Sequence, residues 1–567
     1  MHAATRLARK LDSLLASEAP STYRGTFILF LIYLFGSAGM MLWVGPYVQN
    51  AFGHDLPVYY AGAWKMLWGY KPHVDFHSPL GVMNFAFVYA GMKLTGVNAY
   101  SIATGNTLVF LIVSAVAWAV CRLRFAPVLC LIYTLFAGWM VMCAHYLRYD
   151  FLATAYAGLY NRQGYALLLV LMAQAFLPSK EKFAERGLLD GAIFGAISVT
   201  LLFLKVTYFL AGAGIFALGL LLRNVSWRML VGVGIGSILV ALPTLIYFNF
   251  DLVPYYQDLA FAGKVRSTVD DAGGNPAISL ISRTVALRYA LEMIPAVVLL
   301  LLMCFTAIGS SHGNSLGRIA GWPGFVCVGA TAAISLGLLL TNSPLGDKSH
   351  VPLISALGLI LLQRSFRSTS EPGGAIWRRA ASCLIAILLI LPLSTSAVGS
   401  FAYTAYFKVA KADHRPATEI FSAAPLARLI IPGTGGDPAS APFTYAQKIN
   451  DALALLDQHV PRDATVETLD FTNLLPFAGQ RPPARGPLFW QYRLSFTEKQ
   501  TLSAERAFGD ADVLMIPKYS GDPDSTVMLQ QIYREYLAAN YQHHAESDQW
   551  ILLTRRPQQA APRDSLL

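Results

Sequence analysis

Long apolar runs separated by short polar segments dominate the first 400 residues of this 567-residue chain. A helix needs about 20 consecutive apolar residues to cross a bilayer, and eleven runs approach or reach that length. They lie near residues 26–45, 100–121, 125–145, 164–178, 188–204, 206–222, 229–249, 289–309, 323–342, 350–363 and 380–399. The pattern predicts a polytopic α-helical membrane protein with about 11 transmembrane helices.

A further apolar segment, residues 80–96, contains Asn84 and Lys93 and decides the orientation of everything that follows it. Cytoplasmic segments of membrane proteins are enriched in Lys and Arg. If this segment does not span, the basic clusters all fall on one side, namely those at 6–24, 122–124, 180–186, 223–228 and 364–379. We therefore expect an interfacial or re-entrant helix at 80–96, a cytoplasmic N-terminus and an external C-terminal part.

The composition changes near residue 400. The first 400 residues contain about 42 charged side chains and the last 167 about 34, so the charged fraction rises from roughly 10% to roughly 20%. We expect a transmembrane domain over 1–400, which includes a first external loop at 46–99 with juxtamembrane helices. A soluble extracytoplasmic α/β domain is expected over 401–567. Its pattern predicts helices at 445–458 and 525–541 and strands at 465–471, 512–517 and 549–555.

The net charge of +10 belongs to the membrane part, where Lys and Arg outnumber Asp and Glu. It is therefore mainly the topology signal, and no nucleic-acid partner is expected. The six cysteines lie in or beside the apolar runs, which excludes a disulfide scaffold.

The segment between the first two predicted spans is the richest in chemistry. Asp55 follows the first span by about ten residues, close to where a lipid-borne substrate would present its head group. A carboxylate there could act as a general base, which must come within about 2.6–3.2 Å of the acceptor hydroxyl. It could also cap a helix beginning at Leu56-Pro57, and the two roles are compatible.

This arrangement resembles the GT-C glycosyltransferases, integral membrane enzymes that take a sugar from a polyprenyl-phosphate carrier. The match consists of a first span, an acidic residue in the next loop, and the segment GYKPHVDFHSPLG at 69–81 leading into a juxtamembrane helix. A weaker match is YNRQGY at 160–165. His54 stands where the family commonly has a second acid.

The resemblance implies an inverting transfer with Asp55 as catalytic base and a polyprenyl-phosphate sugar as donor. The acceptor would be a cell-envelope lipid or glycan, such as lipid A, lipopolysaccharide or a polysaccharide, and less readily a protein. It also implies a bacterial inner-membrane protein with a periplasmic C-terminal domain. The sequence contains no nucleotide-binding glycine loop or catalytic-serine elbow, which fits a donor already activated as a lipid phosphate.

Three basic residues on the predicted outer side are candidates for the leaving phosphate. Lys205 stands alone in the apolar hairpin 188–222, and ionisable groups at such depth are usually functional. Arg162 and Arg148 could make bidentate phosphate contacts. For each of the three the alternative is a side chain anchored among lipid head groups.

Other polar residues complete the list of substrate-binding candidates. His73, Asp75 and His77 form H-x-D-x-H, and on an extended segment all three would point to one side and could hold a divalent cation. The alternative is a hydrogen-bonded turn before the juxtamembrane helix, with Asp75 as a second acid that positions the acceptor. Further candidates for contact with substrate are His54, Lys348 and His350.

In the tail, charged and aromatic residues alternate at Arg481, Arg485, Trp490, Tyr492 and Arg493. Such a surface could stack on sugar rings and bind an anionic or glycan acceptor, and the alternative is a loop of a folded domain with ordinary surface arginines. The competing functions are a transporter or lipid flippase, a silent scaffold subunit, or an O-antigen-ligase-type transferase with its key residues in the loop 250–288. Membrane lipids are expected partners. The sugar, the acceptor and the oligomeric state are not specified by the sequence.

Overall fold

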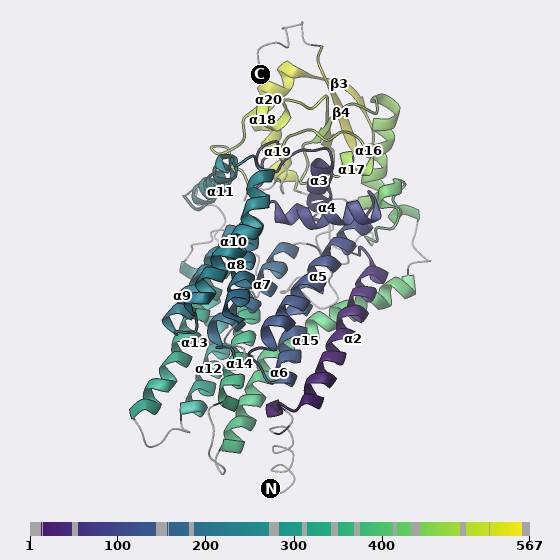
Figure 1. Ribbon diagram of the computed structural model, residues 1–567. Coiled ribbons are helices and arrows are strands. Elements are labelled where there is room, and N and C mark those ends of the chain that lie inside the picture. The colour runs from purple at the N-terminus through teal and green to yellow at the C-terminus, as the bar shows by residue number, and fades with distance from the viewer. Residues whose placement is uncertain are drawn as a thin grey trace.

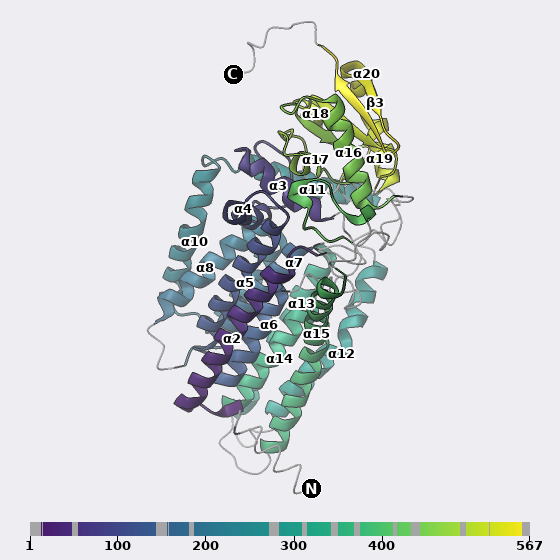
Figure 2. The ribbon, with the colours of Figure 1, turned by 90° about the vertical axis from the view of Figure 1, so that its right-hand side faces the viewer.

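The computed structural model shows a bundle of long helices with an α/β domain at one end (Figure 1). It describes residues 13, 15–47, 55–142, 156, 158–180, 186–271, 283–308, 315–341, 350–367, 375–411, 417–431, 443–487, 491, 495–520 and 522–557. The helix α2 (Pro20–Val44) begins at the end of the bundle that is far from the α/β domain (Figure 2).

Each of the eleven predicted spans coincides with a helix. In the part of the chain that the structure describes, seven helices are long and apolar enough to cross a membrane: α2, α5 (Tyr100–Cys121), α8 (Gly187–Leu204), α10 (Trp227–Tyr247), α12 (Arg283–Ile308), α13 (Ser315–Thr341) and α15 (Ala375–Lys411). The shorter ones are α6 (Pro127–Met142), α7 (Leu159–Phe176), α9 (Val206–Leu221) and α14 (His350–Arg367). Large apolar side chains stay exposed on the outer helices, for example Ile32 and Phe35 on α2 and Leu239 on α10. Lipid would cover such surfaces at no cost, whereas water would not.

Polar contacts join the helices at the end of the bundle that is far from the α/β domain. Arg124, after α5, forms a buried ion pair of 2.5 Å with Asp190 on α8. Lys180 donates a hydrogen bond to the Tyr23 hydroxyl on α2. This end carries Arg24, Arg122, Lys180 and Arg186, the described members of three basic clusters that the charge pattern assigns to the cytoplasmic side.

Three helices lie at the other end, next to the α/β domain: α3 (Leu56–Leu67), α4 (Met83–Thr95) and α11 (Val253–Asp271). α4 lies across the bundle beneath that domain (Figure 1). At 13 residues it is only about 20 Å long, too short for a bilayer core of about 30 Å. The prediction that 80–96 does not span is confirmed. α11, inside the loop 250–288, was not predicted.

The C-terminal domain is built around a four-stranded sheet of order β1-β2-β4-β3, in which β1 and β2 are parallel and the other pairs antiparallel. The strands are β1 (Val466–Thr468), β2 (Val513–Pro517), β3 (Tyr541–Glu546) and β4 (Trp550–Arg555). The helices are α16 (Tyr445–His459), α17 (Leu475–Ala478), α18 (Ala504–Phe508), α19 (Pro523–Ile532) and α20 (Arg534–Asn540), preceded by short 3₁₀ turns at Ala417–Glu419 and Ala424–Leu426.

The three predicted strands and the helix at 445–458 are confirmed. The single helix expected at 525–541 is wrong, because the chain breaks at Tyr533 into α19 and α20. β3 was missed because it is a mostly exposed edge strand with the polar sequence YQHHAE. The division expected at residue 400 falls inside α15, which continues to Lys411.

Candidate functional site

Asp55 directly precedes α3 and is 8% exposed. Its backbone is helical (φ −81°, ψ −26°) instead of extended, and its side chain makes no capping hydrogen bond to the first turn of α3. The capping role considered for Asp55 is therefore wrong.

Tyrosines connect Asp55 to the N-terminus of α7. Tyr59, one turn along α3, is fully buried, and burial raises the pKa of its hydroxyl well above the usual value; Tyr160 and Asp55 raise that pKa further. α7 begins after Gly158, which has a φ of +65° and makes no side-chain cap. Tyr160 thus lies at an uncapped helix N-terminus, whose dipole favours negative charge.

Lys205 reaches the same tyrosine from another direction. It sits at the break between α8 and α9, where its backbone is extended (φ −165°, ψ 123°). Its ammonium group lies 5.0 Å from the centre of the Tyr160 ring and 3.5 Å from Asn161 Oδ1. Tyr208 on α9 donates a hydrogen bond of 3.1 Å to the same Asn161 oxygen. We call the group Asp55, Tyr59, Tyr160, Asn161 and Lys205 the Asp55–Lys205 site.

The break that carries Lys205 is held by the end of the first loop. The carbonyl oxygen of Leu204 accepts hydrogen bonds from the backbone N–H of Gly81 (3.3 Å) and from the side chain of Asn84 (2.6 Å). A Cβ on Gly81 would lie 2.0 Å from the carbonyl oxygen of Phe203, so only glycine allows this approach. The end of the segment 69–81, which carries the family resemblance, therefore packs against Phe203 and Leu204, directly before Lys205.

Arg162 lies next to Asn161 and is 3% exposed. Its guanidinium donates hydrogen bonds to the carbonyl oxygens of Met140 (2.9 Å) and Trp139 (3.4 Å) at the end of α6. These carbonyls have no partner within the helix. Arg162 thus joins α6 to α7 beneath the site, and its predicted contact with phosphate remains a prediction.

The H-x-D-x-H segment does not have the predicted extended geometry. His73 has a φ of +70°, and the chain forms a turn that separates Asp75 from the two histidines. His73 Nδ1 lies 2.9 Å and His77 Nδ1 2.6 Å from the two carboxylate oxygens of Asp258 on α11. Asp75 instead accepts a hydrogen bond from the backbone N–H of Lys71. The cation site expected on these three residues is wrong, and the hydrogen-bonded turn is confirmed.

Asp258 is 1% exposed and joins three parts of the chain. In addition to its contacts with the two histidines, the Asp258 carboxylate accepts a hydrogen bond from the backbone N–H of Ser78. It accepts another, at 3.3 Å, from the guanidinium group of Arg506 on α18. Burial alone would raise the pKa of this carboxyl group, but the hydrogen bonds from His73, His77 and Ser78 outweigh it and lower the pKa to about 2. Asp258 thus links the first loop, α11 and the C-terminal domain.

Replacing Asp258 by Asn is expected to lower the free energy of unfolding by about 2 kcal/mol at pH 7, since a pKa shift of one unit corresponds to about 1.4 kcal/mol. A carboxyl group with a lowered pKa stabilises the fold above its unfolded value, and that contribution disappears as the pH falls through the folded value. The difference in melting temperature from the wild type should therefore narrow between pH 4 and pH 2. Glu292→Gln, which removes an exposed ion pair with Arg288, is the control and should change stability by less than about 1 kcal/mol. A difference that stays constant with pH would contradict this assignment.

Other predicted residues lie outside this geometry. His54, Arg148 and Lys348 fall outside the described residues, and His350 is the first residue of α14, with no description of its side chain. No group of three or more His, Cys, Asp or Glu that could hold a metal occurs within the described ranges. Arg481 is fully buried and binds the carbonyl oxygens of Leu456 and Val460, so its predicted role on a glycan-binding surface is wrong.

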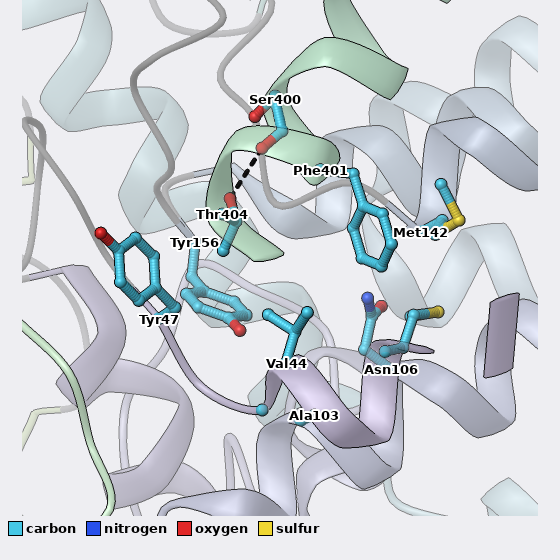
Figure 3. A pocket seen from close by; sticks show the side chains of 11 residues that line it. Val44, Tyr47, Ala103, Asn106, Met142, Tyr156, Ser400, Phe401 and Thr404 are labelled. Carbon is cyan, nitrogen blue, oxygen red and sulfur yellow. Dashed lines mark hydrogen bonds between the residues drawn. The ribbon is translucent and has the colours of Figure 1, made fainter. Parts of the chain in front are cut away.

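A pocket opens among α2, α5 and α15 near the start of α7 (Figure 3). Apolar side chains such as Met41 and Phe401 line it together with Asn106, Tyr156 and Thr404. Asn106 also accepts a hydrogen bond from Gln163 on α7. The pocket therefore lies against the same helix that carries Tyr160.

Sequence reasoning missed Tyr59, Asn161, Tyr208 and Asp258. The YNRQGY segment offered a signal for Asn161, because it places polar residues at the start of an apolar helix. Nothing local in the sequence indicates Asp258, whose histidine partners are 181 and 185 residues away.

The fold and the site define a polytopic helical membrane protein with a C-terminal α/β domain, in which a buried Asp55 and a half-buried Lys205 lie at the end of the helical bundle next to that domain. The chain is similar, over 95% of its length, to two crystal structures of ArnT from Cupriavidus metallidurans. The one bound to undecaprenyl phosphate has 14% identity and a TM-score of 0.48, and the apo state has 13% identity and a TM-score of 0.45; 99% of each of those chains is covered. No protein-family model and no curated protein matches the sequence.

Proposed function

We propose that this protein is an inverting glycosyltransferase. It moves a monosaccharide from a polyprenyl-phosphate carrier to a cell-envelope acceptor at the outer face of the bacterial inner membrane. The acceptor is lipid A, lipopolysaccharide, a polysaccharide or another glycan, and less readily a protein. The observation that supports this most strongly is the link through two tyrosines at the end of the bundle where a lipid head group would lie. Asp55 and Tyr160 both act on the buried Tyr59 hydroxyl, and the Lys205 ammonium group lies over the Tyr160 ring.

The chemistry of a direct displacement assigns a task to each side of the site. Asp55 takes the proton of the acceptor hydroxyl, whose oxygen attacks the anomeric carbon of the sugar. The bond from that carbon to the phosphate oxygen breaks, and polyprenyl phosphate leaves with the electron pair. A single displacement of this kind inverts the anomeric configuration.

Lys205 and the N-terminus of α7 stabilise the departing phosphate. Lys205 is held by Asn161 and by the face of the Tyr160 ring, so its charge is oriented before the substrate arrives. The N-terminus of α7, which follows Gly158, adds the positive end of a helix dipole. Preorganised charge of this kind is commonly the largest single contribution to catalysis.

The charge distribution supports the outer location. The basic clusters lie at the far end of the bundle, which the positive-inside bias assigns to the cytoplasm. The Asp55–Lys205 site and the C-terminal domain lie at the opposite end and would face the periplasm.

The test is transfer by the purified protein in liposomes that contain polyprenyl-phosphate monosaccharides with a labelled sugar and extracted envelope lipids and glycans. We expect the label to move to an acceptor, with one polyprenyl phosphate released per sugar. The envelope of a deletion strain should lack the mass of one sugar residue. Passage of the intact carrier across the bilayer would instead identify a flippase, and carrier binding without turnover would identify a scaffold subunit.

A further inference from the structure

The C-terminal domain packs against the last turns of α3. The Tyr60 ring stacks on Phe477 with ring centres 4.8 Å apart, and Trp64 donates its indole N–H to the carbonyl oxygen of Arg481. Lys65 donates a hydrogen bond of 2.7 Å to the carbonyl oxygen of Arg485. Three successive contacts therefore join this helix to the segment 477–485.

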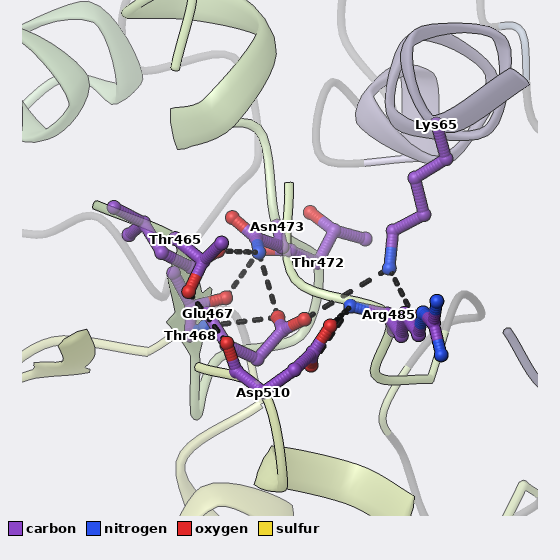
Figure 4. Close-up of polar contacts among 9 residues, drawn as sticks. Lys65, Thr465, Glu467, Thr468, Thr472, Asn473, Arg485 and Asp510 are labelled. Atoms are coloured by element: carbon purple, nitrogen blue, oxygen red, sulfur yellow. Dashed lines mark hydrogen bonds and ion pairs between the residues drawn. The ribbon is translucent and has the colours of Figure 1, made fainter. Parts of the chain in front are cut away.

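Lys65 is a buried cation in this contact. It is 2% exposed, and its ammonium group lies 4.0 Å from Glu467 Oε2 and 5.3 Å from the centre of the Phe76 ring. Glu467 on β1 is fully buried, and its other oxygen accepts hydrogen bonds from Asn473 (2.6 Å) and from the backbone N–H of Thr468 (2.9 Å), as Figure 4 shows. Lys65 is thus the cation that faces the Glu467 carboxylate.

The loop at Arg485 and Gly486, which lies beside Lys65 and Glu467, is also held by Asp510. A Cβ on Gly486 would lie 2.5 Å from Glu467 Oε2, so the backbone passes the carboxylate closely. Asp510 accepts the backbone N–H of Arg485 with both oxygens, at 3.0 and 2.8 Å. The Arg485 guanidinium lies over Tyr70 and 3.8 Å from Asp75. These are the charged and titratable groups around the pair.

Two buried charges in contact are sensitive to displacement, because separating them leaves each charge uncompensated. α3 is a single helix of 12 residues, and Lys65 follows Asp55 by ten residues, or about 15 Å along the helix. A shift of the last turn therefore moves the first turn. Displacements of about 1 Å at a reacting group can cost about 100-fold in rate.

We propose that Lys65 and Glu467 form a clamp through which the C-terminal domain holds α3 and so places Asp55 for the transfer reaction. The inference rests on the proposed function and adds Lys65 as a positioning residue, together with a task for the C-terminal domain. Lys65 touches no substrate and acts only through α3.

The protonation of Glu467 sets the pH above which the clamp is charged. Burial raises the pKa of Glu467 to about 7, although Lys65, Thr468 and Asn473 each act to lower it. Burial likewise lowers the pKa of Lys65, against the opposing effect of Glu467. Below about pH 7 the carboxyl group is protonated and the charge attraction to Lys65 is absent. Because the pKa of Glu467 is raised on folding, the free energy of unfolding falls as the pH rises through about 7, while the charged form of the clamp appears.

The test uses the full-length protein with Lys65→Met, Lys65→Arg and Glu467→Gln, and with Lys448→Met as matched control. Lys448 forms a similarly buried ion pair with Asp470 in the same domain, at 2.7 Å, and among the described residues its ammonium group has no hydrogen bond or ion pair with α3. Lys65→Met should lower kcat by about 10- to 100-fold with an unchanged KM for the donor, and Lys65→Arg should recover part of it. In the wild type we expect kcat to change with pH near pH 7, where Glu467 titrates, and Glu467→Gln should abolish that pH dependence. Lys448→Met should lower the melting temperature with kcat within about twofold of the wild type.

A second readout is independent of turnover. Hydrogen exchange of the backbone over residues 56–60 should rise in Lys65→Met and not in Lys448→Met. If the wild type transfers no sugar but this difference is present, the proposed function fails and the clamp stands. Equal exchange in the two variants, or a kcat for Lys65→Met no lower than that of Lys448→Met, would overturn the clamp.

Discussion

Replacing Asp55 by Asn is expected to lower kcat for sugar transfer by about 10²- to 10⁴-fold, the usual contribution of a general base. The amide has the shape of the carboxylate but cannot accept the proton of the acceptor hydroxyl. Since Asp55 does not cap α3, the melting temperature of the variant should stay close to that of the wild type. The measurement is single-turnover transfer by reconstituted protein with saturating donor.

A matched control for Asp55→Asn is Asp251→Asn. Asp251 lies at the same end of the bundle, where it accepts the backbone N–H of Val253 at the start of α11 at 2.9 Å. We expect it to retain nearly full activity with a slightly lower stability. Wild-type turnover by a correctly folded Asp55→Asn protein would remove Asp55 from the reaction.

Replacing Lys205 by Met should produce the second-largest loss, about 10²- to 10³-fold in kcat, as for the loss of one preorganised group that stabilises charge in a transition state. Asn161 and Tyr160 hold the Lys205 side chain in place at the α8–α9 break. Because the proposed task of Lys205 is to stabilise the leaving phosphate, its removal should lower the rate of transfer. Lys205→Arg keeps the charge and should recover part of the rate.

Lys93→Met provides the comparison for Lys205. Lys93 lies exposed near the end of α4, with its ammonium group over the Tyr89 ring, as expected of a lysine that reaches lipid head groups. Its removal should leave kcat and the KM for the donor unchanged. If Lys205→Met behaves like Lys93→Met, Lys205 is also a head-group anchor and takes no part in the reaction.

The membrane part of the fold could be predicted from the sequence because the length of an apolar run is a direct physical requirement for spanning. The segment 80–96 was excluded as a span by the Lys and Arg bias of the loops on either side of the membrane. α11 and β3 were missed because neither has a strong apolar period: the first lies in a polar loop and the second at an exposed sheet edge.

The site was predictable only where a charge stood out from its surroundings. Lys205 is conspicuous because it is alone among apolar residues, and Asp55 because it follows the first span. The charge pairs that join distant segments have no such signal. Asp258 and Glu467 resemble ordinary surface acids in the sequence, and only the fold brings them to His77 and Lys65.

The backbone conformation of the first loop could not be predicted from the local sequence either. An extended H-x-D-x-H segment would have placed its three side chains on one side, but the positive φ of His73 turns the chain. Two histidines then face one buried carboxylate, and Asp75 faces the C-terminal domain near Arg485.

The most direct test of the central claim is the structure of the protein with a polyprenyl phosphate bound. We predict density for the phosphate within about 3 Å of the Lys205 ammonium group, a charge-assisted hydrogen-bond distance. It should lie beside Tyr160 and face the Asp55 carboxylate across a space that holds a sugar ring. A phosphate bound at the far end of the bundle, or bound at Lys205 with Asp55 directed away from it, would contradict the account.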